Sequence, residues 1–380
     1  YSLTADRPSV TNALAVIQSY SPWRPSAGVT ESGLTIKDLD NSDLTYEKKH
    51  ELNIGADLGF LDNRINLTVD WYKRDNFDLI GRVMTQGIGG QIQKYGNVAT
   101  MKSRGIEFSL STKNIKTKDF SWTTDFIYSH MKNEVTKFNT STRAFNLVSG
   151  IGFSREGYPV NSLFSYDFRG LNEDGVPTFI NEAGVLTSTD INFQETERFD
   201  NLVYSGPSEP TDVGSFGNIF QYKGLRLNVF ITYSFGNVVR LDPVFSSIYN
   251  DLDAMPREFR NRWMTPGDER YTDVPAIVSS RQVRNDSKLS YAYNAYNYST
   301  ARIAKGDFIR MKEISLTYDF PKRWIKKLRM SNLALKIQAT NLFLIYADKK
   351  LNGQDPEFFN SGGVATPVPK QFTLTLKIGL

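Results

Sequence analysis

Apolar and polar residues alternate along many short stretches of this 380-residue chain. In the last ten residues, 371–380, every even position is apolar and every odd position is polar or glycine. A period of two places the two kinds of side chain on opposite faces of a β-strand. The same pattern predicts strands at Glu47–Gly59, Ile65–Trp71, Arg104–Lys113, Phe120–Tyr128, Phe216–Tyr222, Leu225–Phe235, Phe308–Phe320, Leu333–Phe343 and Gln371–Leu380.

Short and long connections alternate between these strands. Short turns are predicted at 61–64, 114–119 and 222–224, and a modest basic segment with one helical turn at 321–332. Outer-membrane barrels have short turns on one side and long loops on the other. The pattern therefore predicts an all-β fold, an antiparallel transmembrane β-barrel. Its long extracellular loops are expected near 73–103, 129–214, 236–306 and 344–370.

The two faces of the strands differ in chemistry. The apolar face is expected to meet lipid, and the chain has 25 Phe, 19 Tyr and 5 Trp although its mean hydropathy is only −0.39. Aromatic residues near strand ends are candidates for the interfacial girdles, and they are Trp71, Trp122, Tyr128, Tyr233, Phe235, Tyr318 and Phe320. Carboxylates on the other face are expected to line an aqueous lumen, or else to form the solvated face of an ordinary sheet; they are Glu51, Asp57, Asp70, Glu107, Asp125, Glu313 and Asp319.

Nine or ten strands leave two open sheet edges. In lipid each unpaired backbone group costs several kcal/mol, so an open edge is not tolerated. We therefore expect the chain to be the C-terminal part of a single larger barrel, 1–380, whose other strands precede Tyr1. No secretory signal is visible at the start, which agrees with that expectation.

Composition argues against several classes of chemistry. The chain has no cysteine, and its net charge of +4 is too small a bias to indicate nucleic-acid binding. His50 and His130 have no partner at the spacing of a catalytic triad or metal site. Residues 38–43 resemble a calcium loop but lack its glycine and final glutamate, and 87–90 lack the spacing of a dinucleotide site. We expect no enzyme activity, metal or cofactor.

One segment carries candidate ligand-binding chemistry. Four tyrosines in residues 291–298 are interleaved with asparagines and offer flat faces and hydroxyls to a sugar or a peptide. Alternatively, the rings pack this loop against the barrel or a partner. Nearby, Arg260 and Arg262 either engage an anion or pair with acids, which are Asp251, Asp253 and Glu258. The candidate substrate-binding residues are Tyr291, Tyr293, Tyr296, Tyr298, Arg262 and Trp263.

A series of motifs runs in one order over nearly the whole chain. They are Leu44–Gly55, Asp70–Arg74, Gly96–Val98, Met101–Phe108, Glu156–Val160, Gly170–Gly175, Trp263–Asp268, Lys305–Lys312, Asn341–Leu342 and Gly353–Glu357. This series resembles the C-terminal barrel region of the SusC/RagA family of TonB-dependent outer-membrane transporters of Bacteroidetes-type bacteria. Two features depart from the family: no signal, TonB-contacting segment or plug is identifiable, and the chain ends in Leu380 rather than in an aromatic residue.

The resemblance implies import rather than catalysis. Such transporters have barrels of roughly 22 strands and are driven by TonB with ExbB and ExbD acting on the plug, here through the missing N-terminal region. A SusD-like lipoprotein caps the outer mouth, and pairs of such complexes are common. The implied substrate is an oligomeric nutrient, either glycan or peptide. The alternatives are a passive porin-like or adhesive barrel and a soluble β-rich binding module.

Overall fold

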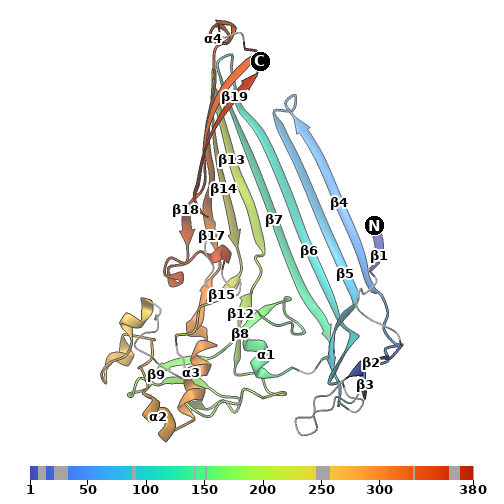
Figure 1. Ribbon diagram of the computed structural model, residues 1–380, viewed down its shortest axis with the longest axis vertical. Coiled ribbons are helices and arrows are strands. Elements are labelled where there is room, and N and C mark those ends of the chain that lie inside the picture. The colour runs from blue at the N-terminus through green and yellow to red at the C-terminus, as the bar shows by residue number, and fades with distance from the viewer. Residues whose placement is uncertain are drawn as a thin grey trace.

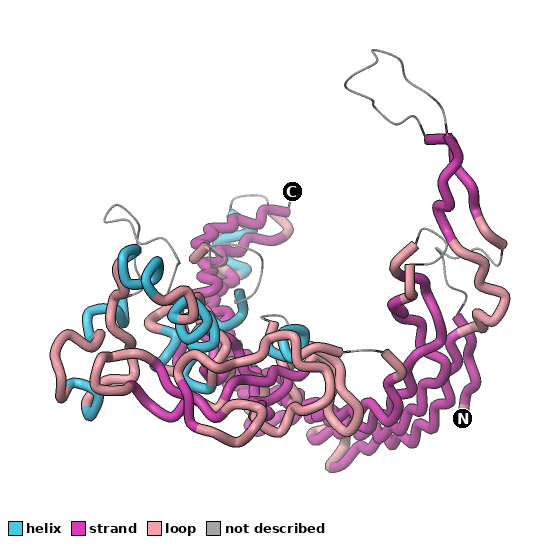
Figure 2. Tube along the Cα trace, turned by 90° about the horizontal axis from the view of Figure 1, so that it is seen from below, coloured by secondary structure: helices cyan, strands magenta, loops and turns pink. Residues whose placement is uncertain are grey.

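A ten-stranded antiparallel sheet forms the body of the molecule (Figure 1). The computed structural model describes residues 1–6, 14–20, 33–87, 91–140, 142–149, 152–244, 257–327, 330–358 and 369–379. Seen from below in Figure 2, the sheet is a curved wall. Its strands in spatial order are β1 (Ser2–Asp6), β4 (Glu47–Phe60), β5 (Ile65–Met84), β6 (Gln93–Lys116), β7 (Phe120–Phe138), β13 (Asp212–Tyr222), β14 (Leu225–Phe235), β17 (Phe308–Asp319), β18 (Asn332–Ala347) and β19 (Gln371–Gly379).

All nine predicted strands are confirmed, but the limits of the first long loop were wrong. Strand β5 continues to Met84 and β6 begins at Gln93, so the loop predicted at 73–103 is a long hairpin with a connection at 85–92. The alternation of apolar residues stops near Trp71, whereas the backbone ladder continues. Beyond Trp71 the paired strands include the charged residues Lys73, Arg74 and Asp75. Strands can pair through their backbones without an apolar face where both faces of the sheet meet water.

One face of the sheet is an exposed apolar surface. Cross-strand pairing joins Leu374 to Ile337 and Ile337 to Leu316. The row continues through Leu227 and Phe220 to Trp122 on β7. Leu374 is 70% exposed. A continuous apolar band without a protein partner is the surface that a membrane barrel presents to lipid.

Aromatic clusters lie at two levels of this apolar face. Toward the short turns, Tyr318 contacts Phe320, and Phe320 contacts Trp324. Toward the long connections, Tyr233 contacts Phe126 and Phe235. These positions match the two aromatic girdles expected of a transmembrane barrel.

The other face carries a polar network. Thr68 donates a hydrogen bond to Asp57, Ser111 donates to Asp125, and Gln338 donates to Glu313 at 2.9 Å. Each bond joins neighbouring strands, so these carboxylates stabilise the sheet as well as making this face polar.

The two ends of the sheet differ strongly. At the turn end lie the short connections and α4 (Lys322–Lys327), the helical turn predicted within 321–332; positions 328 and 329 of that segment lie outside the described residues. Within the described part of the chain, no helix is long and apolar enough to cross a membrane. The small hairpin β2 (Val16–Tyr20) and β3 (Gly33–Asp38) lies beside the opposite end (Figure 1).

At that opposite end the long connections fold into a body that we call the loop layer, the described residues of 139–211, 236–306 and 348–358 (Figure 1). Its elements are α1 (Ala144–Val148), β8 (Ser162–Tyr166), β9 (Phe168–Leu171), β10 (Pro177–Ile180), β11 (Leu186–Thr187), β12 (Leu202–Pro207), β15 (Val238–Arg240), η1 (Arg257–Asn261), η2 (Asp268–Arg270), α2 (Ser280–Asn285), α3 (Leu289–Asn297), η3 (Thr300–Arg302), β16 (Ile303–Lys305), η4 (Lys349–Leu351) and η5 (Pro356–Phe358).

The main hydrophobic core lies in the loop layer rather than in the sheet. Leu147 of α1, Phe164 of β8, Phe179 of β10 and Tyr296 of α3 belong to one buried cluster and are at most 2% exposed. The sheet cannot supply such a core because one of its faces is apolar and exposed and the other is polar. The long connections are therefore a folded body of their own.

Candidate functional site

The tyrosine-rich segment is not a loop but the helix α3. Tyr293 and Tyr296 are three positions apart, so they lie on one helix face, and that face is buried in the loop layer. The Tyr293 hydroxyl donates to the carbonyl of Ala276 at 2.7 Å. Burial raises the pKa of both phenols. These two rings pack within the loop layer itself, whereas the second interpretation placed them against the barrel or a partner.

The other two tyrosines are more accessible. Tyr291 is 49% exposed and its ring lies 6.1 Å from Phe193. Tyr298 is half-buried beside the guanidinium of Arg240, 5.6 Å from its ring centre. Substrate contact stays a prediction for Tyr291 and Tyr298, whereas Tyr293 and Tyr296 fill the core.

Arg262 and Trp263 have structural partners. Arg262 donates to the carbonyl of Phe259, and the indole nitrogen of Trp263 donates to Glu269 at 3.1 Å. The predicted acid Glu258 pairs instead with Arg302, 2.5 Å away; Asp251 and Asp253 lie outside the described residues.

Motifs that are far apart in sequence meet in pairs at this end of the molecule. The Asn97 side chain accepts from the backbone of Thr45 at 2.8 Å and donates to the carbonyls of Thr45 and Asp78. The ring of Trp263 covers Gly175, where an added Cβ would lie 2.5 Å from the indole. The guanidinium of Arg310 binds Asp355 and lies 3.1 Å from Glu357. These motifs therefore fasten the long connections to one another and to the strand ends.

A buried cation on β15 contacts β8 and has no acidic partner among the described residues. Arg240 is 6% exposed and donates to the carbonyl of Phe164 and the hydroxyl of Ser165. Burial lowers the pKa of Arg240 to about 10. The contacts tie two segments of the loop layer together.

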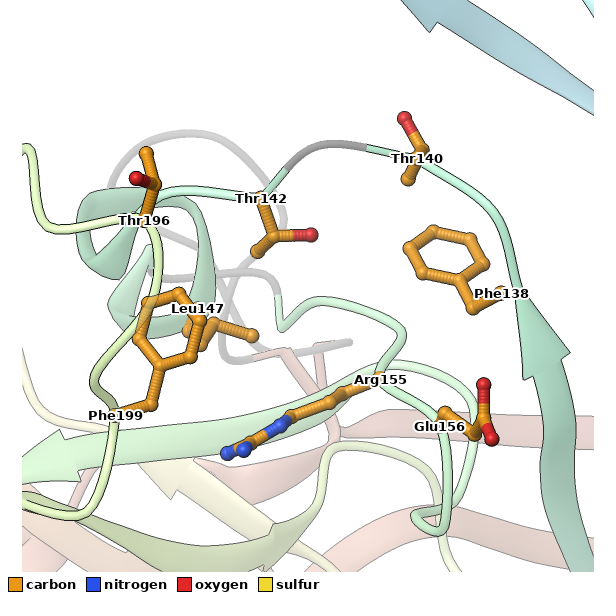
Figure 3. Close-up of a pocket in the computed structure, with 8 residues that line it drawn as sticks. All are labelled: Phe138, Thr140, Thr142, Leu147, Arg155, Glu156, Thr196 and Phe199. Carbon is orange, nitrogen blue, oxygen red and sulfur yellow. The ribbon is translucent and has the colours of Figure 1, made fainter.

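A cavity of about 250 Å³ opens in the loop layer beside the end of β7 (Figure 3). Its lining is Phe138, Thr140, Thr142, Leu147, Arg155, Glu156, Thr196 and Phe199. The guanidinium of Arg155 lies between 5.3 and 5.6 Å from the ring centres of Tyr158, Phe164 and Phe199. The sequence prediction missed this cavity because its lining comes from residues up to 61 positions apart.

The two histidines lie on strands of the sheet, His50 on β4 and His130 on β7. His130 and Tyr128 both contact Asp212, at 2.8 and 2.7 Å, on the face that carries the aromatic girdle. His50 packs edge-on against Phe77. Among the described residues, no three His, Asp or Glu side chains are grouped as a metal site requires.

Comparison with known proteins agrees with this architecture. Residues 7–342 match the family model for the TonB dependent receptor-like β-barrel. A TonB-dependent receptor of Formosa agariphila is 26% identical over 344 residues, covering 86% of this chain and 32% of the relative. SusC of Bacteroides thetaiotaomicron, also a TonB-dependent receptor, is 27% identical over 357 residues, covering 90% of this chain and 32% of SusC.

The fold also matches a solved structure. The RagAB peptide transporter structure superposes with a TM-score of 0.77 at 24% identity, covering all of this chain and 40% of that one. The chain spans about a third of the length of the curated relatives it matches. It belongs to the TonB-dependent receptor-like β-barrel family, which places its sheet in the bacterial outer membrane. The predicted resemblance to SusC/RagA proteins is confirmed.

Proposed function

We propose that this chain forms the C-terminal strands of an outer-membrane barrel that actively imports an oligomeric nutrient, either glycan or peptide. The observation that carries the proposal is the combination of a lipid-facing apolar band with a polar inner face and a folded loop layer at one end. The sheet ends at β1 and β19, so a closed barrel requires further strands. Family membership supports energy coupling through TonB, ExbB and ExbD.

A SusD-like surface lipoprotein is the proposed partner of the loop layer. The surface of the loop layer exposes several apolar or aromatic side chains, and Tyr271 is 89% exposed. Val185 and Leu186, at the tip of the β10–β11 hairpin, are more than half exposed. The ion pairs and motif contacts described above hold this surface in shape, as a docking surface requires.

Purification of the native protein from outer membranes tests this assignment. We expect the polypeptide that contains the β19 peptide to be larger than 43.1 kDa and to co-purify with a lipoprotein. The double variant Val185→Asp with Leu186→Asp should lower the amount of lipoprotein recovered, whereas Thr187→Asp, on the same hairpin, should not. A water-soluble polypeptide without detergent would contradict the assignment.

The passive-barrel alternative differs in one respect. A porin-like barrel needs no energy from the inner membrane, so its transport would survive deletion of TonB. Uptake measured with and without TonB separates the two functions.

A further inference from the structure

We propose that Arg155 binds a carboxylate group of the transported oligomer in the cavity of Figure 3. This inference rests on the proposed import function and names a chemical class for the substrate. The buried Arg302 is paired with Glu258. Arg155 is half-buried, and among the described residues its guanidinium has aromatic rings but no acid as partners.

Three rings surround the guanidinium of Arg155. A planar guanidinium binds aromatic rings through its faces and carboxylates through the N–H groups at its edge. Contacts with Tyr158, Phe164 and Phe199 therefore hold the group in place and leave its edge able to form two parallel hydrogen bonds to a carboxylate.

The neighbouring acid Glu156 does not neutralise it. Glu156 is exposed, and its carboxylate points away from the guanidinium in Figure 3. No carboxylate of the described residues lies within ion-pair distance of Arg155.

The remaining lining suits one unit of an oligomer. Three threonines offer hydroxyl groups, while Phe138 and Leu147 supply an apolar wall. The volume of about 250 Å³ is below the roughly 300 Å³ at which pockets for whole drug-sized ligands begin. The cavity therefore has room for a terminal residue or sugar that carries the carboxylate, with the rest of the oligomer outside.

Binding of matched ligand pairs to the full-length transporter with its lipoprotein tests the proposal. The pairs are trigalacturonic acid with its methyl ester, and penta-alanine with its carboxyl-terminal amide. In at least one pair the wild-type protein should bind the carboxylate about tenfold more tightly than the neutral ligand. Arg155→Gln should abolish that preference. Arg198→Gln is the control because it removes an exposed arginine near the same cavity.

Three results would overturn the assignment: no preference in either pair, a preference that survives Arg155→Gln, or equal loss of the neutral ligands, which would mark Arg155 as a packing residue. The pair that shows the preference distinguishes a uronate from a peptide terminus. TonB-dependent uptake is measured separately in cells. If uptake persists but no carboxylate preference is found, the proposed Arg155 site is wrong while the proposed import function still stands.

Discussion

At the scale of single residues, alanine substitutions at two glycines in equivalent turns distinguish the cost of backbone strain from the cost of a steric clash. Gly175 and Gly184 have φ of +73° and +76°, and each turn is closed by an asparagine three positions earlier. An added Cβ meets nothing at Gly184 but lies 2.5 Å from Trp263 at Gly175. Gly184→Ala should cost about 1 kcal/mol of loop-layer stability, and Gly175→Ala clearly more. Trypsin cleavage of the loop layer on intact cells measures both; equal cleavage rates would mean that Trp263 does not hold this turn.

The sequence indicates the turn at Gly175, but it does not indicate that Trp263 packs against this glycine. An asparagine followed three positions later by a glycine indicates a turn through local hydrogen bonds. The contact between Gly175 and Trp263 joins residues 88 positions apart and depends on how the loop layer folds. For the same reason, no pattern indicated that Arg310 binds Asp355 or that aromatic rings surround Arg155.

At the scale of elements, the two faces of β19 should respond differently to charge. Leu374 lies in the apolar row, and Thr373 beside it pairs with Gln338 on the polar face. A cation near the middle of the lipid face costs roughly 2–4 kcal/mol, and the lumenal face tolerates it. Leu374→Arg should therefore lower the amount of heat-modifiable, folded barrel in outer membranes, and Thr373→Arg should leave it nearly unchanged. Equal losses would contradict the assignment of these faces.

The strands were predictable and the helix α3 was not. Period-two alternation is a local signal because the membrane and the lumen impose it on every spanning residue. Residues 289–297 carry no such constraint, and their tyrosines and asparagines are typical of loops as well as helices. Burial of Tyr293 and Tyr296 against distant segments decides the outcome there.

At the scale of the whole molecule, the sheet and the loop layer would have separate tasks in the proposed importer. The sheet has an apolar face and a polar face, and the loop layer, with its own core, forms a folded surface at one end of the sheet. Sequence alternation predicted nine of the ten strands of the sheet, but it missed β1 and the extensions of β5 and β6. It did not predict how the long connections fold, because their packing depends on contacts between residues that are far apart in the sequence.

Energy-dependent uptake of oligomers is the most direct test of this account. Cells with and without the gene would be given fluorescent glycans and peptides of several units, before and after deletion of TonB. The account predicts accumulation of at least one oligomer class that requires both the gene and TonB. Uptake that needs the gene but survives loss of TonB would contradict the active-import claim and leave a passive barrel.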